Sequence, residues 1–260
     1  MNALLMEDEL PAVDLREADG PFVIVCEHAS NVLPRGLGTL GLGAEELQRH
    51  IAWDPGAFDV ARLIAGQTDA ALVAQRYSRL AIDCNRDPLL PDAIPARSED
   101  TDIPGNIGLS PEAKKSRIKA LWEPFHAALD RIVGARLRAR RPTAIVTIHS
   151  FTPVYRGVSR PWHAGIISTD ERSFADRVLA ALRRDPMLVV GDNEPYSSKD
   201  NVDYTIRRHG RDRGLPHVMV EIRNDLLRTR AEIEAWADRL TDALLTSSSA
   251  AGLSPARVEG

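Results

Sequence analysis

Seven short apolar runs, rich in β-branched residues and bounded by turn residues, limit the folds open to this chain. They are FVIVC (22–26), ALVAQ (71–75), LAIDC (80–84), AIVTI (144–148), AGIIS (164–168), MLVV (187–190) and HVMVEI (217–222). Several are apolar throughout, which is typical of strands covered on both faces. Amphipathic stretches that predict helices lie between them, at 56–67, 111–140, 171–184, 201–209 and 229–246. Strands that alternate with helices predict a mostly parallel sheet with helices on both of its faces.

The chain has no internal repeat and no interdomain linker, so we expect a single domain over residues 1–260. From Thr246 the composition turns to Ser, Ala and Gly, and residues 246–260 are expected to form a mobile tail. The segment 87–108 is rich in Pro, Asp and Gly and has no periodic pattern. Loops of that length are uncommon inside a compact domain and often line a site.

Composition excludes several classes of partner. The 33 basic and 37 acidic residues give a net charge of -4, with no long run of either sign, which argues against nucleic-acid or membrane binding. No apolar span could cross a bilayer, and the N-terminus is acidic, unlike a signal peptide. Cys26 and Cys84 both lie in apolar runs, as expected of core thiols in a reducing compartment. We therefore expect a cytoplasmic globular protein, of an oligomeric state that the sequence leaves open.

Polar side chains follow several of the predicted strands. The segments concerned are Glu27-His28 after 22–26, Asn85-Arg86 after 80–84, His149 after 144–148, and Glu221-Ile222-Arg223 at the end of the last run. In an open parallel sheet, ligands bind outside the carboxyl ends of the strands. These residues are therefore expected to meet at one edge of the sheet.

Two histidines at strand ends, with a carboxylate nearby, suit a catalytic zinc site, which takes three protein ligands and leaves one position open. We expect His28 and His149 to bind the metal, although each imidazole alone could simply cap a strand. Asp54 is the favoured third ligand, but it could instead cap the helix that follows. Glu27 is the alternative, although neighbouring residues of a strand point to opposite faces.

The pair Asn85-Arg86 suits an acidic substrate, because a guanidinium matches a carboxylate in two parallel hydrogen bonds. Arg79 lies at the other end of the same predicted strand, so it reaches the site only if a bend brings it there; otherwise it forms a salt bridge elsewhere. Glu221 could act as the general base near a metal. Its alternative role is an ion pair with Arg223 or Arg207.

Three further residues are candidate substrate contacts. Tyr196 could donate to a substrate oxygen or belong to an ordinary surface turn. His209, followed by a glycine, could contact substrate or end a helix. Arg223 lies at the ligand edge of the sheet. A nucleophilic Cys84 is a further possibility, but a thiol within a strand is expected to be buried and inert. We expect His50, His126 and His217 to be structural.

Six blocks occur in one order over residues 20 to 226: CEHASNVLP, HIAWDPGA, YSRLAIDCNR, IHSF, GDNEPYS and RRHGRDRGLPHVMVEIRNDL. This ordered set resembles the N-formylglutamate amidohydrolase family, which is similar to the zinc carboxypeptidase and aspartoacylase group. The resemblance implies a phosphorylase/hydrolase-like three-layer α/β sandwich and a site for Zn²⁺ or another divalent metal.

The resemblance also implies roles for individual residues. Asn85 and Arg86 would bind the substrate carboxylate, Arg79 would stabilise the oxyanion, and Glu221 would act as the base. One position departs from the wider group: Asn31 stands where a His-x-x-Glu spacing from His28 would place a glutamate.

The expected function is metal-dependent hydrolysis of an N-formyl acidic amino acid such as N-formyl-L-glutamate, giving formate and the free amino acid. A related deacylase or carboxypeptidase, acting on another N-acyl amino acid or a short peptide, is the alternative enzyme. Because Asn31 stands in place of that glutamate, a further alternative is a small-molecule binding protein that has the same fold but no catalytic activity.

Overall fold

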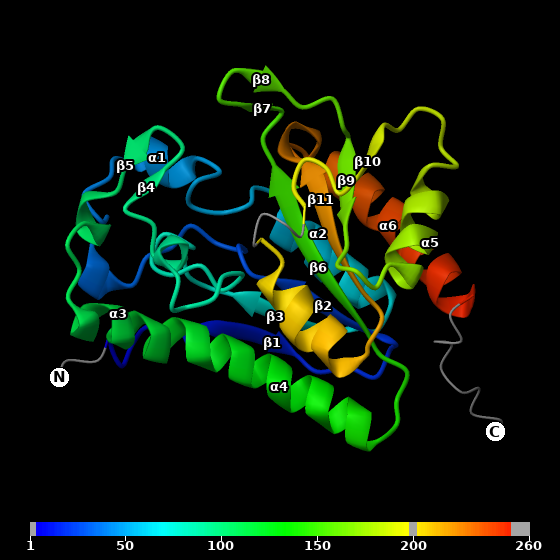
Figure 1. The fold of residues 1–260 in the computed structure, drawn as a ribbon, viewed down its shortest axis with the longest axis horizontal. Helices are drawn as coiled ribbons and strands as arrows, with labels where there is room; N and C mark the ends of the chain where they lie inside the picture. Colours follow the sequence, from blue (N-terminus) through cyan, green and yellow to red (C-terminus); the bar gives the residue numbers. More distant parts are fainter. Residues whose placement is uncertain (1–3, 198–201, 251–260) are drawn as a thin grey trace.

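A seven-stranded sheet forms the middle of the computed structural model, which describes residues 4–197 and 202–250 (Figure 1). Its order is β1-β3-β2-β6-β11-β9-β10. The strands are β1 (Val13–Arg16), β2 (Phe22–Cys26), β3 (Ala71–Gln75), β6 (Ala144–Phe151), β9 (Ala164–Ile167), β10 (Val190–Asp192) and β11 (His217–Arg223).

The sheet is mixed but mostly parallel, as predicted. Strands β3, β2, β6 and β11 run parallel to one another, and β10 runs parallel to β9. Edge strand β1 is antiparallel to β3, and β9 is antiparallel to β11. Every residue of β2, β3 and β6 is buried, which explains why these runs are apolar throughout.

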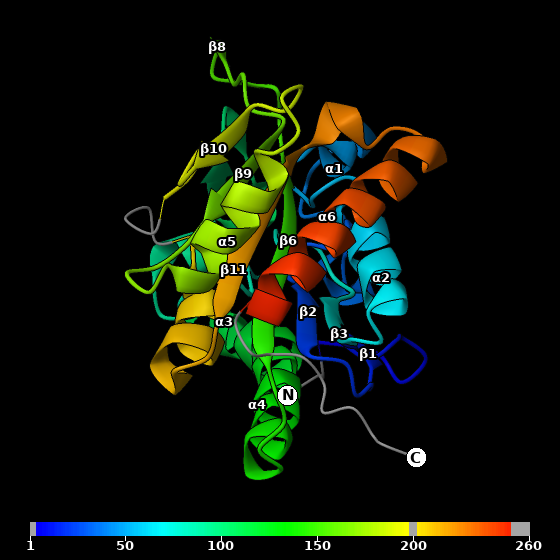
Figure 2. The ribbon, with the colours of Figure 1, turned by 90° about the vertical axis from the view of Figure 1, so that its right-hand side faces the viewer.

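Helices cover both faces of the sheet, which confirms the three-layer α/β architecture. On one face, α2, α5 and α6 pack against Phe22, Ile24 and the other strand residues of the larger core; on the other face, Val23 and Val25 meet α4 (Figures 1 and 2). The helices are α1 (Ala44–Gln48), α2 (Ala57–Gln67), α3 (Pro111–Arg117), α4 (Glu123–Arg138), α5 (Ser173–Leu182) and α6 (Arg230–Ala250). A π-helical turn, η4 (Ile118–Trp122), joins α3 to α4.

The prediction of a strand over 80–84 is wrong: this segment forms turns. It is apolar because Leu80, Ala81, Ile82 and Cys84 are buried in the core. Its carbonyl groups are paired by side chains instead of a strand. Asn106 donates to Leu80 over 2.9 Å, and Arg117 donates to Ala81 over 3.0 Å. Periodicity alone does not separate such a buried turn segment from a strand.

Other boundaries also differ from the predictions. Edge strand β1 was not predicted, and the strand predicted at 187–190 begins only at Val190. Residue 201 of the helix predicted at 201–209 lies outside the described part, and the structure has a π-helical turn, η6 (Ile206–Gly210), that extends one residue beyond the predicted end. Helix α6 continues to Ala250, so the expected tail begins inside a helix; residues 251–260 lie outside the described part.

The segment 87–108 carries a small hairpin of β4 (Arg97–Ser98) and β5 (Thr101–Asp102). A second hairpin, β7 (Val154–Tyr155) and β8 (Val158–Ser159), extends from the end of β6 (Figure 1). No helix among residues 4–197 and 202–250 is long and apolar enough to span a lipid bilayer.

Candidate active site

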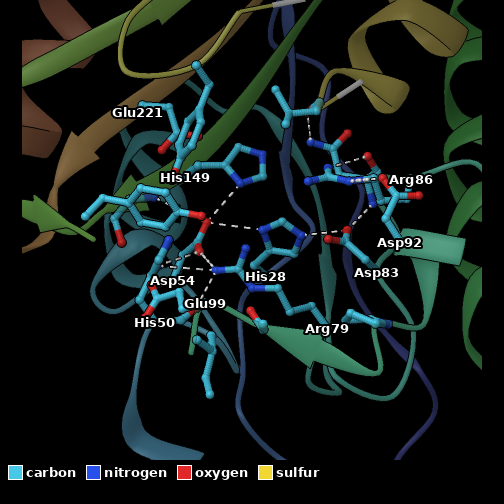
Figure 3. A pocket seen from close by; sticks show the side chains of 18 of the residues that line it. His28, His50, Asp54, Arg79, Asp83, Arg86, Asp92, Glu99, His149 and Glu221 are labelled. Atoms are coloured by element: carbon cyan, nitrogen blue, oxygen red, sulfur yellow. Dashed lines mark hydrogen bonds and ion pairs between the residues drawn. The ribbon is translucent and has the colours of Figure 1, made fainter. Parts of the chain in front are cut away.

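A cavity of about 380 Å³ opens at the carboxyl ends of β2, β6 and β11 (Figure 3). This volume lies in the range of small-molecule sites. Its lining comes from loops far apart in the sequence, including the segment 87–108, which confirms the expectation that this loop lines a site. The lining residues used below are His28, His50, Asp54, Arg79, Asp83, Asn85, Arg86, Asp92, His149, Tyr155, Tyr196 and Glu221.

His28, Asp54 and His149 converge in the cavity wall. Their ligand atoms all lie within 4.8 Å of one another. Asp54 Oδ2 is 2.9 Å from Nδ1 of His149 and 3.3 Å from Nδ1 of His28. Two imidazole nitrogens and one carboxylate oxygen form a donor set that Zn²⁺ commonly takes, with a further position left for water or substrate. The three residues expected to hold the metal are therefore brought together.

A second carboxylate stands behind each imidazole. Asp83 Oδ1 lies 2.8 Å from Nε2 of His28, and Glu27 Oε2 lies 3.1 Å from Nε2 of His149. A neutral imidazole that holds its proton on Nε2, facing a carboxylate, presents the lone pair of Nδ1 to a metal. Glu27 lies behind His149 and outside the group of three ligands, so the geometry favours Asp54 over Glu27 as the third ligand.

The electrostatics of this cluster also fit a cation. Burial lowers the pKa of His149, but Glu27 and Asp54 outweigh it and hold that pKa well above the usual value. Burial raises the pKa of Asp54, yet Arg79 and His28 bring it well below the usual value. The buried carboxylates thus favour positive charge between them, which a divalent metal ion supplies.

Arg79 reaches the cavity because residues 78–81 form a turn instead of a strand. Its terminal Nη2 donates to the Asp54 carboxylate, to the His50 carbonyl over 2.7 Å and to the Trp53 carbonyl over 3.2 Å. A bend of the chain, without which Arg79 was not expected to reach the site, is therefore present. The guanidinium is fixed beside the candidate metal ligands.

Glu221 lies in β11, directly opposite His149 of β6 in the sheet register. Its side chain is buried, and its Oε2 atom has no hydrogen-bond partner among the described residues. Neither Arg223 nor Arg207, both described, forms an ion pair with it. Burial raises the pKa of Glu221 to about 7, with His149 opposing and Asp54 adding to the rise. A carboxyl group with such a pKa can both accept and return a proton near neutral pH.

Asn85 and Arg86 both line the cavity, but they differ in whether their side-chain polar groups are free to bind a ligand. Nδ2 of Asn85 donates to the Val202 carbonyl over 2.6 Å, and its Oδ1 accepts from the Thr205 amide over 3.0 Å. Asn85 therefore ties the segment 202–205 to the cavity wall. Arg86 makes a 3.3 Å ion pair with Asp92, whose carboxylate is half exposed. Arg86 is the better placed of the two to meet a substrate anion.

Tyr196 lines the cavity, whereas two other expected substrate contacts do not. His209 is fully buried in η6, and its Nε2 lies 2.9 Å from Nδ1 of His126. Arg223 lies outside the cavity lining because its Nε donates to Asp225 over 2.8 Å. The structure therefore does not bring His209 and Arg223, both expected to contact substrate, to the cavity, since neighbouring groups of the protein hold both side chains.

Asp83 was not identified as a site residue from the sequence, and His50 was expected to be structural, yet both line the cavity. His50 lines the cavity with Nδ1 3.3 Å from Asp54 Oδ1, and burial together with Arg79 lowers its pKa to about 3. Both residues belong to blocks that carry the family resemblance, HIAWDPGA and LAIDCNR, which is the signal that could have found them. Asn31 lies outside the cavity lining and donates to the Leu47 carbonyl over 2.9 Å. Cys84 is buried, as expected of an inert thiol.

Comparison with known proteins agrees with this architecture. A crystal structure of a gene product from Agrobacterium tumefaciens is 43% identical, covers 96% of this chain and 99% of that one, and has a TM-score of 0.93. N-formylglutamate amidohydrolase from Ralstonia eutropha JMP134 is 20% identical, covers 92% of this chain and 98% of that one, and has a TM-score of 0.61, which shows a common fold. No curated protein sequence matches the chain. The pattern of the N-formylglutamate amidohydrolase family matches residues 20–228. The chain therefore belongs to the N-formylglutamate amidohydrolase family, whose members hydrolyse amides.

Proposed function

We propose that this amidohydrolase releases formate from an N-formylated acidic amino acid such as N-formyl-L-glutamate, with Zn²⁺ or another divalent metal as its cofactor. The observation that carries the proposal is the meeting, in one cavity, of the His28–Asp54–His149 group and the buried carboxyl group of Glu221, whose Oε2 has no hydrogen-bond partner in the described part of the chain. The family and the donor chemistry of the three ligands support it. The two buried free thiols fit the expected cytoplasmic location.

A divalent cation held by His28, Asp54 and His149 would polarise the formyl carbonyl and make a water molecule more acidic. Glu221 would take a proton from the attacking water, whose oxygen bonds to the formyl carbon. The carbon–nitrogen bond then breaks, and Glu221 would return the proton to the departing amine. Formate and the free amino acid are the products.

The arginines of the cavity would handle the negative charges of this reaction. Arg79, held by Asp54 and by two carbonyl groups, would stabilise the charge that develops on the formyl oxygen. Arg86 would bind a carboxylate of the amino acid in exchange for its half-exposed partner Asp92. Asn85 would act indirectly, through the segment 202–205 that it holds.

A substrate panel with the metal-loaded protein tests the proposal. We expect formate release from N-formyl-L-glutamate or N-formyl-L-aspartate, and much slower hydrolysis of N-acetyl-L-glutamate and of dipeptides that end in glutamate. Glu221→Gln keeps the shape of the side chain but cannot accept the proton, so kcat should fall by roughly 10²- to 10⁴-fold. Faster hydrolysis of the acetyl or peptide substrates would replace the deformylase assignment with a deacylase or a carboxypeptidase.

A further inference from the structure

We propose that Arg160 is a positioning residue, which fixes the hydroxyl group of Tyr196 as a hydrogen-bond donor to the formyl oxygen of the substrate. The inference rests on the proposed function of the cavity and adds a residue that neither the sequence motifs nor the metal site assigns. Arg160 follows the β7–β8 hairpin, and Tyr196 follows β10.

Arg160 is a buried cation that has no acidic partner within residues 4–197 and 202–250. Only 7% of the residue is exposed, and no carboxylate among the described residues forms an ion pair with it. Its guanidinium carbon lies 4.5 Å from the ring centre of Tyr155, 4.9 Å from that of Tyr196 and 5.8 Å from that of Phe151. Burying an unpaired charge is costly, and three aromatic faces offset part of that cost. The position of the Arg160 guanidinium therefore depends on the three rings around it, and the positions of those rings depend on the guanidinium.

The hydrogen bond between Arg160 and Tyr196 has only one possible direction. Nη1 of Arg160 lies 3.2 Å from the Tyr196 hydroxyl oxygen. A guanidinium carries donors and no acceptor, so the tyrosine oxygen accepts and its own hydrogen must point elsewhere. No described residue accepts a hydrogen bond from that hydroxyl group. Because Tyr196 lines the cavity, an oxygen of the ligand can accept that hydrogen.

The reacting end of the substrate is the natural acceptor. Burial raises the pKa of Tyr196 to about 12, Glu221 adds to the rise, and Arg160 and Arg79 oppose it. The hydroxyl group therefore keeps its proton at neutral pH and lies within the electrostatic reach of the proposed base and the proposed oxyanion-binding arginine. A carbonyl oxygen that gains negative charge there would strengthen the hydrogen bond from Tyr196.

A double-mutant cycle on kcat and KM tests the proposal. Tyr196→Phe removes the donor and should lower kcat for N-formyl-L-glutamate by roughly 10- to 100-fold, with a smaller change in KM. Arg160→Met keeps a side chain of similar length between the rings but loses the hydrogen bond, and should lower kcat by a similar factor. Because Arg160 acts only through Tyr196, the double variant should be no slower than Tyr196→Phe. Arg160→Lys, which keeps a charged donor, should recover part of the lost kcat.

Arg239→Met is the matched control, because Arg239 also stacks on an aromatic ring, Trp236 at 5.0 Å, but lies on α6 away from the cavity. This variant should keep the wild-type kcat. Multiplying effects in the double variant, or a change in KM alone, would overturn the positioning role.

The two proposals fail in different ways. If the wild-type protein hydrolyses no N-formyl substrate, the proposed function is wrong, and a crystal structure of Arg160→Met still decides the role of Arg160. A Tyr196 hydroxyl displaced in Arg160→Met and restored in Arg160→Lys supports the inference. An unmoved hydroxyl in Arg160→Met contradicts it.

Discussion

At the scale of single residues, two carboxylates outside the His28–Asp54–His149 group lie beside the candidate metal-binding imidazoles. Asp83 and Glu27 each contact the far nitrogen of one histidine, at 2.8 and 3.1 Å. Such partners fix the tautomer and raise the basicity of the ligating nitrogen. Glu27 and His28 are neighbours in sequence, yet Glu27 contacts His149 and not His28, because adjacent residues of an extended segment point to opposite sides.

Glu27→Gln should therefore weaken metal binding without removing a ligand. The amide oxygen can stay beside Nε2 of His149, but it carries no negative charge, so the affinity for Zn²⁺ should fall roughly 10- to 100-fold. Competition with a chromophoric chelator measures this change independently of turnover. Asp69→Asn, which alters an exposed carboxylate paired with Arg16, is the control and should leave the affinity unchanged. Unchanged affinity in Glu27→Gln would show that Glu27 does not support the metal site.

At the scale of elements, the segment 79–86 shows how an irregular backbone is held in a core. The π-helical turn η4 lies between α3 and α4, and this continuous helical stretch carries three donors to the segment, namely Arg117, Trp122 and His126. Arg117 donates to the Ala81 carbonyl over 3.0 Å, and Trp122 Nε1 donates to the Arg86 carbonyl over 3.0 Å. His126 Nε2 lies 2.9 Å from the Cys84 carbonyl. Buried carbonyls outside the sheet need such partners.

Trp122→Phe should loosen the substrate-binding end of this segment. The variant keeps an aromatic ring but leaves the Arg86 carbonyl without its donor, so the free energy of unfolding should fall by roughly 1–3 kcal/mol. The KM for an acidic substrate should rise as Arg86 becomes less well placed. Urea denaturation and steady-state kinetics measure the two effects. An unchanged KM in a destabilised variant would mean that the hydrogen bond stabilises the fold without positioning Arg86.

The contact between α4 and η6 predicts acid sensitivity. Burial lowers the pKa of His126 and of His209 from the ordinary 6.5 to about 3. At pH values above 6.5, both imidazoles are neutral in the folded and in the unfolded chain. As the pH falls below that value, only the unfolded chain takes up these protons, so the free energy of unfolding falls with the pH, by about 1.4 kcal/mol per pH unit for each histidine.

Urea denaturation at about pH 7 and about pH 5 measures this dependence. His126→Gln keeps a donor for the Cys84 carbonyl but cannot titrate in this range, so its loss of stability between the two pH values should be smaller by the share of one histidine. An identical loss in the variant and the wild type would show that His126 is protonated in the folded state.

At the scale of the whole molecule, the candidate metal site joins segments that are far apart in the chain. His28 follows β2, Asp54 precedes α2 and His149 lies in β6, so a cation bound by all three links the middle of the sheet to the loop before α2. A ligand that binds only the folded chain stabilises it, by about 2.7 kcal/mol at a free concentration 100 times its Kd.

Removal of the metal by a chelator should therefore lower the unfolding temperature, and stoichiometric Zn²⁺ should restore it. His149→Asn should abolish the effect of added Zn²⁺, because one of the three ligands is lost. Differential scanning calorimetry measures both. If the unfolding temperature of the wild-type protein were the same with and without the metal, a shared site at these three residues would be contradicted.

The amino-acid pattern was enough to predict the layers, most of the strands, and the meeting of His28, His149 and Glu221 at one edge of the sheet. These features follow from local periodicity and from the rule that parallel strands present their carboxyl ends together. The residue pattern already indicated Arg86 as a carboxylate-binding group, the family resemblance assigned a role to Arg79, and the structure places both in the cavity.

The other features of the site depend on contacts between distant segments, which the folded structure shows. The tertiary structure turned the apolar run 80–84 into turns, placed Glu27 behind His149, and buried His209 against His126. It also gathered three rings around Arg160. No local sequence pattern predicts these outcomes, because each depends on which distant side chain pairs with a buried polar group. That partner is chosen by packing in three dimensions, not by spacing along the chain.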